Sequence, residues 1–210
     1  IGKDMNLKKR DFINLADFDK ESIVFMLDLA ARLKQETKVG IEHKILKGKT
    51  VVMYFAKPSL RTRLSFETGI YQLGGNPIVV KQEEIILGSR ESIEDTARVI
   101  SRYADGITIR TFAHSDVEKF AQYADIPVIN ALTDSSHPCQ IMADLLTIKE
   151  KFGNLENLKL AYVGDGNNIT NSLLIGCSML GMDISVGCPE DYEPDKNYIA
   201  KAEELALISG

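Results

Sequence analysis

The sequence predicts an α/β protein in which helices cover both faces of a mainly parallel sheet. Strand-like and helix-like segments alternate along most of the 210 residues, a pattern typical of crossover connections between parallel strands. Short apolar runs rich in β-branched residues predict strands near 49–55, 77–81, 106–111, 126–130, 158–163 and 182–187. Sheets of this kind bind ligands beyond the carboxyl ends of their strands.

Helical spacing of apolar residues fills the gaps between these strands. The first helix, 20–36, is expected to turn Ile23, Leu27, Ala30 and Ala31 inward. The next helix should begin just after Pro58, because helical spacing follows the strand-breaking proline at once. Further helices are expected from the capping-box-like Ser92 onward and over 116–123, 138–151, 170–180 and 196–207.

Composition excludes several classes of protein. A hydrophobic content of 44% with 26% charged residues is that of a globular protein, and no apolar run approaches the roughly 20 residues that cross a bilayer. The net charge of -5 argues against general nucleic-acid binding, so clustered arginines should serve a small anion. Three cysteines without Cys-x-x-Cys spacing predict neither a disulfide framework nor a structural zinc site, and a reducing compartment. A removed leader before Ile1 stays open.

The segment from Ser59 to Gly69 has the features of a phosphate site. It follows a predicted strand and a proline, so Ser59 should lie near the N-cap of a helix. The first backbone N–H groups of a helix lack intrahelical partners, and with the helix dipole they favour an anion. Hydroxyl and guanidinium donors are added by Ser59, Arg61, Thr62 and Arg63. The alternative is a capped helix whose arginines lie on its solvated face.

Two later segments are candidates for the same ligand. Arg110 ends an apolar strand at the edge where parallel sheets bind ligands, although an arginine at such a place more often forms a surface ion pair. His137 precedes Pro138, which suits the first turn of a helix, and Gln140 lies in that turn. His137 and Gln140 could therefore face one ligand, with simple capping as the alternative for His137.

Two further features are weaker candidates. Cys139 has no legible base partner and is expected to be a small packing residue rather than a nucleophile. The turn from Gly164 to Asn168 follows a buried strand but lacks the third glycine of a dinucleotide fingerprint. Its asparagines are expected either to cap the next helix or to contact the polar end of a substrate.

One domain boundary is expected at 151–154, where a long helix ends in Gly153 and Asn154 before a new strand. It separates a first domain, 1–150, from a second, 151–210. The second part supplies two predicted strands and about two helices, which is thin for an independent core. We therefore expect the second α/β domain to be incomplete in this chain.

Taken in order, these segments resemble the carbamoyltransferases. The resemblance is carried by 55–63 (Phe-Ala-Lys-Pro-Ser-Leu-Arg-Thr-Arg), Arg110, 137–140 (His-Pro-Cys-Gln) and 164–168. It extends over essentially the whole chain, through 73–75, 91–98 and 192–194. The pair of Ser-x-Arg-Thr-Arg and His-Pro-x-Gln is highly specific for this superfamily, and the ornithine branch is the best match.

The resemblance implies a three-layer, parallel-sheet fold and transfer of a carbamoyl group from carbamoyl phosphate to an amine, with no metal or organic cofactor. By similarity, the phosphate would be held by Ser59, the Leu60 backbone, Arg61, Thr62 and Arg63. The carbonyl oxygen would face Arg110, His137 and Thr62, and the carbamoyl nitrogen would face Gln140. Donors fixed at both places lower the barrier, because negative charge grows on that oxygen and then on the leaving phosphate. The base for the amine stays open, and the leaving phosphate could take its proton.

The acceptor that the resemblance implies is L-ornithine, giving L-citrulline. Lys57 stands where aspartate enzymes usually carry an acidic residue, and the paired Asn167 and Asn168 also favour ornithine, with Asn168 at its amino-acid end. Two acceptor motifs of the family, Asp-x-x-x-Ser-Met-Gly and His-Cys-Leu-Pro, do not occur before Gly210. We therefore expect a fragment with a partial acceptor half, and putrescine, acylated ornithine and aspartate stay open as acceptors.

The resemblance also implies a homotrimer or higher homo-oligomer of arginine biosynthesis or the urea cycle, in the cytoplasm or, in a eukaryote, the mitochondrial matrix. One position departs from the pattern, since the family usually has a polar residue reaching a neighbouring subunit where this chain has Ile86. Either Gln82 or Ser89 supplies that contact, or the interface has fewer polar donors. Two other classes stay open: a non-catalytic subunit that binds carbamoyl phosphate, and a nucleotide-binding module at 164–168.

Overall fold

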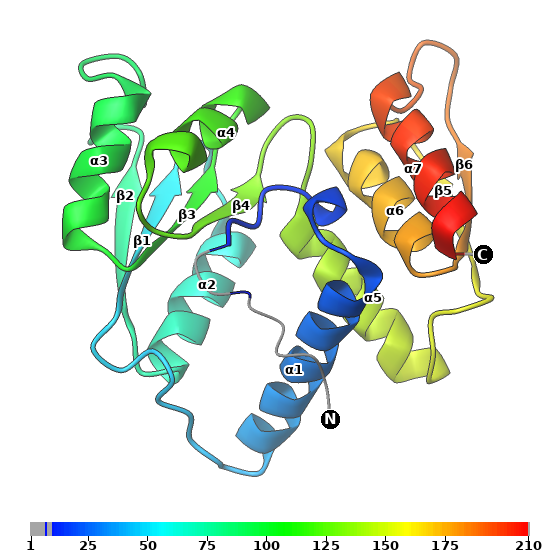
Figure 1. The fold of residues 1–210 in the computed structure, drawn as a ribbon, viewed down its shortest axis with the longest axis horizontal. Coiled ribbons are helices and arrows are strands. Elements are labelled where there is room, and N and C mark those ends of the chain that lie inside the picture. The colour runs from blue at the N-terminus through cyan, green and yellow to red at the C-terminus, as the bar shows by residue number, and fades with distance from the viewer. Residues whose placement is uncertain (1–6, 8–9, 210) are drawn as a thin grey trace. The chain divides into compact units, whose positions relative to one another are not determined.

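The computed structural model, which describes Leu7 and residues 10–209, has the alternating helices and strands that the sequence predicts (Figure 1). The elements are η1 (Leu15–Asp17), α1 (Lys20–Lys38), β1 (Thr50–Phe55), α2 (Leu60–Gln72), β2 (Asn76–Lys81), α3 (Ile93–Tyr103), β3 (Gly106–Arg110), α4 (His114–Tyr123), β4 (Val128–Leu132), α5 (Pro138–Phe152), β5 (Lys159–Val163), α6 (Asn168–Met179), β6 (Asp183–Gly187) and α7 (Lys196–Ser209). All the named strands pair in parallel, so the predicted α/β class with a parallel sheet is confirmed. Within the described residues, no helix is both long and apolar enough to cross a membrane.

The chain forms two compact units. Unit 1 contains Arg32–Thr133 and the described residues before Asn14, and unit 2 contains Asn14–Ala31 and the described residues from Asp134 onward. Helix α5 ends at Phe152, inside the segment 151–154 where the sequence predicts its end, and Gly153 follows with φ of +83°, a left-handed conformation that glycine adopts at little cost. The domain boundary predicted at 151–154 stays a prediction.

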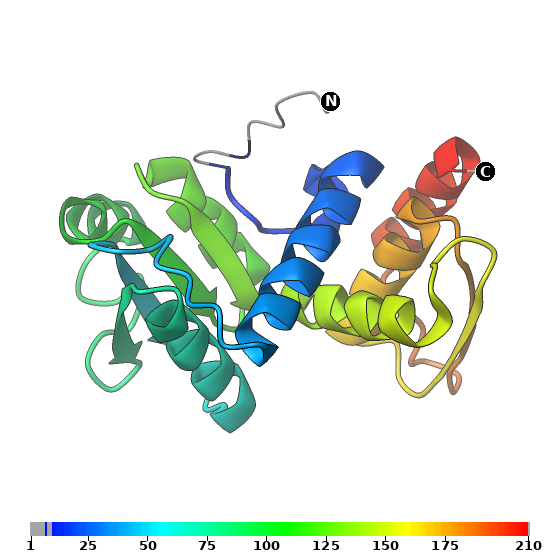
Figure 2. The same ribbon diagram turned by 90° about the horizontal axis from the view of Figure 1, so that it is seen from below.

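Unit 1 is built on a four-stranded sheet in the order β2-β1-β3-β4. Successive side chains of a strand point to opposite faces, and β1 shows why this sheet needs helices on both. Val52 and Tyr54 join the cluster that contains Ala97 of α3 and Phe120 of α4, while Met53 and Phe55 pack with Ile70 of α2. The sheet is therefore the middle of three layers, which can be followed in Figure 2.

Unit 2 contains a two-stranded parallel sheet, β5-β6, and a helix, α6, that is buried along most of its length. Close packing against α5 depends on Gly176. A Cβ built at that position would lie 2.8 Å from the Ile141 side chain, so only glycine lets the two helices approach this closely. The core of this unit thus packs the start of α5 against the second half of α6.

Two local expectations needed correction, and one contact was not predicted. The fourth strand begins at Val128 rather than at 126, because Pro127 has no N–H for the ladder; its carbonyl still accepts from the Ile107 N–H at 3.0 Å. Ala30 of α1 is exposed, so the prediction that it turns inward was wrong, whereas Ile23 and Leu27 are buried as predicted. Phe12 adds an isolated parallel bridge to β4, which the sequence did not predict.

Candidate functional site

Ser59 is the N-cap of α2, as the sequence predicts. Its backbone is extended, with φ of -159° and ψ of 115°, and its Oγ accepts a hydrogen bond from the Thr62 N–H at 3.3 Å. Residues 56–59 connect the carboxyl end of β1 directly to this helix, so the first turn of α2 lies at the edge where a parallel sheet presents ligand-binding groups. The helix N-terminus therefore presents its backbone donors at the predicted place.

The side chains of this first turn differ in the hydrogen bonds and ion pairs that they make. Leu60 is 72% exposed, and Arg61 is also exposed. Arg61 makes no hydrogen bond or ion pair with any described residue, whereas Arg63 donates from Nε to Glu67 Oε2 at 3.1 Å on its own helix. Arg61 therefore offers a whole guanidinium to a ligand, and Arg63 offers the part that Glu67 does not use.

Arg110 lies beside this turn because of the strand register. It is the last residue of β3 and stands opposite Phe55, the last residue of β1. Arg110 donates from Nη1 to Thr62 Oγ1 at 3.3 Å, and its buried Nε has no hydrogen-bond partner among the described residues. No described carboxylate pairs with it, and burial lowers the pKa of its guanidinium. The surface ion pair considered for Arg110 is thus absent from the described part of the chain.

A cavity of about 480 Å³ opens beside the Ser59 cap. Its lining includes Ser59, Arg63, Lys81 and Gln82. Lys81 ends β2 in register with Phe55, and sequence reasoning missed it as a candidate, although a lysine at the carboxyl end of a predicted strand was a legible signal. Strands β1, β2 and β3 therefore all bring polar or cationic groups to one edge of the sheet.

His137 of unit 2 immediately precedes Pro138, the first residue of α5, as predicted. Its backbone occupies the N-cap position, but its side chain makes no capping hydrogen bond, so the simple capping role considered for it is wrong. The residue is only 8% exposed, and its N–H donates to Ser172 Oγ of α6 at 2.9 Å. This hydrogen bond to α6 therefore holds the loop before α5 in place.

The neighbours of His137 have ordinary local roles in this structure. Gln140 is exposed and donates from Nε2 to Asp144 Oδ1 at 2.9 Å, one turn further along α5. Burial raises the pKa of the Asp144 carboxyl, although this hydrogen bond acts in the opposite direction. Burial also raises the pKa of the Cys139 thiol to about 12. A thiol that is neutral at physiological pH is a poor nucleophile, which supports the packing role.

The two asparagines at the start of α6 confirm the capping role for Asn167, and the substrate contact stays a prediction for Asn168. Asn167 is the cap, and its Oδ1 accepts from the N–H groups of Ile169 at 2.9 Å and Thr170 at 3.3 Å. Asn168 is the first residue of α6. Gly166 lies against the 192–195 segment, since its N–H donates to the Tyr192 carbonyl at 2.7 Å. A Cβ on Gly166 would lie 2.2 Å from the Pro194 nitrogen, so this turn requires glycine.

The predicted site residues therefore fall into two sets, one in each unit. Unit 1 holds Ser59, Leu60, Arg61, Thr62, Arg63 and Arg110, linked by the Ser59–Thr62 and Thr62–Arg110 hydrogen bonds. Unit 2 holds His137, Gln140 and Asn168. Their roles toward a ligand stay predictions, and the arrangement within each unit shows what each set can offer.

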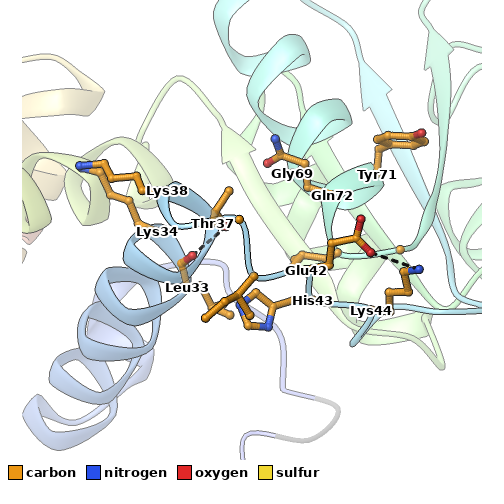
Figure 3. Close-up of a pocket in the computed structure, with 14 residues that line it drawn as sticks. Leu33, Lys34, Thr37, Lys38, Glu42, His43, Lys44, Gly69, Tyr71 and Gln72 are labelled. Atoms are coloured by element: carbon orange, nitrogen blue, oxygen red, sulfur yellow. Dashed lines mark hydrogen bonds and ion pairs between the residues drawn. The ribbon is translucent and has the colours of Figure 1, made fainter.

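A second, larger cavity of unit 1 lies elsewhere. It has a volume of about 990 Å³ and lies between the end of α1, the following loop and the second half of α2. None of the predicted site residues lines it. Figure 3 shows the Lys34 and Lys38 side chains extending together away from Tyr71 and Gln72, so the cationic groups do not converge on this space. Size alone is a poor guide to the site in this chain.

No group of three or more His, Cys, Asp or Glu side chains that could hold a metal ion occurs in the part of the chain that the structure describes.

Comparison with known proteins places both parts of the chain in one family. Residues 10–150 match the description "Aspartate/ornithine carbamoyltransferase, carbamoyl-P binding domain", and residues 156–210 match "Aspartate/ornithine carbamoyltransferase, Asp/Orn binding domain". The chain is 52% identical to an ornithine carbamoyltransferase of Oceanobacillus iheyensis over 97% of its own length and 63% of that relative's. It is 54% identical to one of Symbiobacterium thermophilum over 97% of its own length and 66% of that relative's.

Solved structures agree with these sequence relationships. The ornithine carbamoyltransferase from Pyrococcus furiosus matches with a TM-score of 0.96 and 48% identity, covering 97% of this chain and 65% of that one. The enzyme from Thermus thermophilus matches with a TM-score of 0.87 and 41% identity, covering 94% of this chain and 68% of that one. This chain thus spans about 63–66% of the length of the two curated relatives. It belongs to the aspartate/ornithine carbamoyltransferase family.

Proposed function

We propose that the full-length protein transfers the carbamoyl group of carbamoyl phosphate to the side-chain amine of L-ornithine, giving L-citrulline and phosphate. The observation that carries this proposal is the donor cluster at the sheet edge. Ser59 caps α2, Arg61 is exposed and uncommitted among the described residues, and Arg110 reaches Thr62 at 3.3 Å. The relatives that bear the name ornithine carbamoyltransferase support the same reaction.

The phosphate of carbamoyl phosphate binds at the first turn of α2 in this proposal. The backbone N–H groups there, together with the hydroxyls of Ser59 and Thr62 and the guanidinium of Arg61, complement a dianion. Arg63 contributes the donors that its ion pair with Glu67 leaves available. As the carbon–oxygen bond to phosphate breaks, charge accumulates on the leaving group, and these fixed donors stabilise it.

The carbonyl carbon is activated by donors directed at its oxygen. Arg110, with Thr62 and His137, takes this role, and Gln140 faces the carbamoyl nitrogen. The ornithine amine attacks this carbon and the carbon–oxygen bond to phosphate breaks. The proton that the amine loses passes to the leaving phosphate, because no described residue is a convincing dedicated base. Asn168, in the first turn of α6, contacts the amino-acid end of ornithine.

We also propose that the protein assembles as a homotrimer or higher homo-oligomer through the outer face of α2 and β2. Leu60, Leu64 and Tyr71 are 72%, 52% and 75% exposed along α2, and Ile78 is 44% exposed on the edge strand β2. Such a stripe beside an open strand edge suits burial against another copy. Sedimentation of the full-length protein tests this assembly, and a monomer at micromolar concentration would contradict it.

The expected role of the full-length protein is in arginine biosynthesis or the urea cycle, in the cytoplasm or the mitochondrial matrix.

The experiment that tests the reaction is citrulline formation by the purified full-length protein from ornithine and carbamoyl phosphate. Arg61→Ala should lower kcat/KM by about 10²- to 10³-fold, because one donor to developing charge is lost. Arg98→Ala is the matched control, since Arg98 is exposed on α3 and paired with Asp95, and this variant should retain activity. Turnover of putrescine, acylated ornithine or aspartate in place of ornithine would correct the acceptor. Unaltered activity of Arg61→Ala would overturn the residue assignment.

A further inference from the structure

The beginning of α6 carries buried polar side chains that the proposed reaction does not use. Asn171 and Ser172 are 5% and 3% exposed, although both are polar and lie in the middle of the unit 2 core. Burying such groups costs free energy unless each finds a hydrogen-bond partner. Their partners are therefore informative about what this part of the helix does.

The partners of these two residues lie in two segments that are far apart in the sequence. Ser172 Oγ accepts from the His137 N–H at 2.9 Å, and Asn171 Nδ2 donates to the Ser135 carbonyl at 3.0 Å. The other end of the same amide, Asn171 Oδ1, accepts from the Asp195 N–H at 3.1 Å. One turn of α6 thus bonds the loop before α5 on one side and the start of α7 on the other.

Both bonded segments adjoin groups that the proposed function assigns to substrates. The first ends in His137, which faces the carbonyl oxygen in the proposal. The second, 192–195, also contacts Gly166 through the Tyr192 carbonyl at 2.7 Å, directly before Asn167 and Asn168. Because Asp195 caps α7 by accepting from the Asn197 N–H at 2.8 Å, this segment is fixed at both of its ends.

We infer that Asn171 and Ser172 are positioning residues that hold the His137 loop and the acceptor-side segment 192–195 in fixed positions relative to one another. This inference rests on the proposed function for its kinetic consequences. A single asparagine amide uses its donor on one segment and its acceptor on the other, so neither segment can shift without breaking a buried hydrogen bond. Substrate positioning of this kind affects turnover without any contact to the reacting atoms.

Substitutions of Asn171 can remove its hydrogen bond to Ser135 alone or both of its hydrogen bonds. Asn171→Asp keeps an oxygen that accepts from the Asp195 N–H but replaces the donor to Ser135 with a second acceptor. Asn171→Ala removes both hydrogen bonds. In the full-length protein, Asn171→Asp should lower kcat about tenfold or more and leave the KM for ornithine within about threefold. Asn171→Ala should lower kcat and also raise that KM about tenfold.

Ser172 provides a second test with a matched control. Ser172→Ala should lower kcat about tenfold, because the buried His137 N–H loses its acceptor, and Ser172→Thr, which keeps the hydroxyl, should restore most of it. Ser178→Ala removes a hydroxyl from the same helix at 7% exposure, and no hydrogen bond joins that hydroxyl to either segment, so its kcat should be near that of the wild type. Equal kcat for Ser172→Ala and Ser178→Ala would overturn the inference, as would equal ornithine KM for the two Asn171 variants.

Amide hydrogen exchange separates this inference from the proposed function. Asn171→Asp should speed exchange in 133–137 but not in 192–195, and Asn171→Ala should speed it in both, whether or not the protein makes citrulline. Inactive wild-type protein with this exchange pattern would refute the proposed function and support the positioning role of Asn171. Active wild-type protein whose Asn171 variants exchange like the wild type in both segments would refute the positioning role alone. Thermal midpoints within a few degrees of the wild type identify variants that are folded.

Discussion

Helices α2 and α6 begin in the same way, but the polar residues are more exposed in the first turn of α2 than in the first turn of α6. Each helix follows a parallel strand after a short turn, and each has a side-chain cap, Ser59 in one and Asn167 in the other. The start of α2 leaves Leu60 and Arg61 exposed, whereas the start of α6 buries Thr170, Asn171 and Ser172 and bonds the last two to other segments. The first helix leaves its donors exposed, as the proposed phosphate site requires, and the second bonds its polar groups to loops.

This difference explains why the sequence indicates candidate residues in the first turn of α2 but does not indicate Asn171 and Ser172. Donors that serve a ligand have to be displayed, so their residue types reveal the chemistry directly. Donors that serve the framework act through partners far away in the sequence, and only the folded structure identifies them. Substitutions in the two helices should therefore affect catalysis and stability differently.

The largest expected effect is the loss of the Arg110 guanidinium. Arg110→Ala should lower kcat about 10²- to 10³-fold in citrulline formation, because the proposed reaction uses this half-buried donor at the carbonyl oxygen. Arg110→Lys should recover only part of it, since an ammonium cannot reproduce the fork that reaches Thr62. Arg102→Ala, at an exposed position of α3, is the control and should be active. An Arg110→Ala enzyme with wild-type kcat would remove Arg110 from the site.

Next in size is a pair of glycine substitutions, one in each region. Gly166→Ala should destabilise the protein by about 1–3 kcal/mol and raise the KM for ornithine, because the new Cβ would lie 2.2 Å from the Pro194 nitrogen. Gly69→Ala in α2 meets nothing within 4 Å and should stabilise the helix by about 0.5–1 kcal/mol. Urea unfolding measures both changes, and shifts of the same sign would contradict the comparison.

The caps themselves should differ by a smaller amount. Asn167→Ala removes the acceptor of two backbone N–H groups and should cost about 1–2 kcal/mol of stability, whereas Ser59→Ala removes the acceptor of one at 3.3 Å and should cost about 0.5–1 kcal/mol. Thermal unfolding of the two variants without substrate gives the comparison. Added inorganic phosphate should stabilise the Ser59→Ala protein less than the wild type, which an Asn167→Ala control would not reproduce.

The smallest expected effect belongs to the thiols of Cys139, which is partly buried, and Cys177, which is buried. Cys139→Ala should leave kcat within about threefold, since the pKa of the thiol is about 12 and no thiolate is present near neutral pH. The folded-state pKa lies above the ordinary value of 9.0, so the stabilisation is complete below about pH 9 and is lost as the pH rises toward 12. Urea unfolding between these limits should show a shallower loss of stability in Cys139→Ala, because one of two such thiols, Cys139 and Cys177, is gone. Rapid alkylation of Cys139 at pH 7 would contradict this account.

Much of the fold followed from local patterns. The central strands β1 and β3 are apolar runs with few competing interpretations, and the caps Ser59 and Ser92 lie where the sequence predicts helices to begin. The structure differs from the predictions where contacts between distant parts of the chain decide burial or pairing. Ala30 fits the helical stripe yet is exposed, because the buried face of α1 is set by its neighbours rather than by spacing alone. The bridge from Phe12 to Ile129 joins residues too distant for any local pattern to connect.

The sequence by itself predicted the donor cluster from Ser59 to Arg63, because a strand, a cap and clustered arginines are consecutive in the chain. It also identified Arg110 and His137 as candidates, since each ends or begins an element. Only the tertiary structure decided that Arg110 reaches Thr62, a contact that depends on the parallel register of β1 and β3. It alone revealed that Asn171 and Ser172 bond two remote segments, because the partners of buried polar groups are set by packing, whereas residue type determines only that partners are needed.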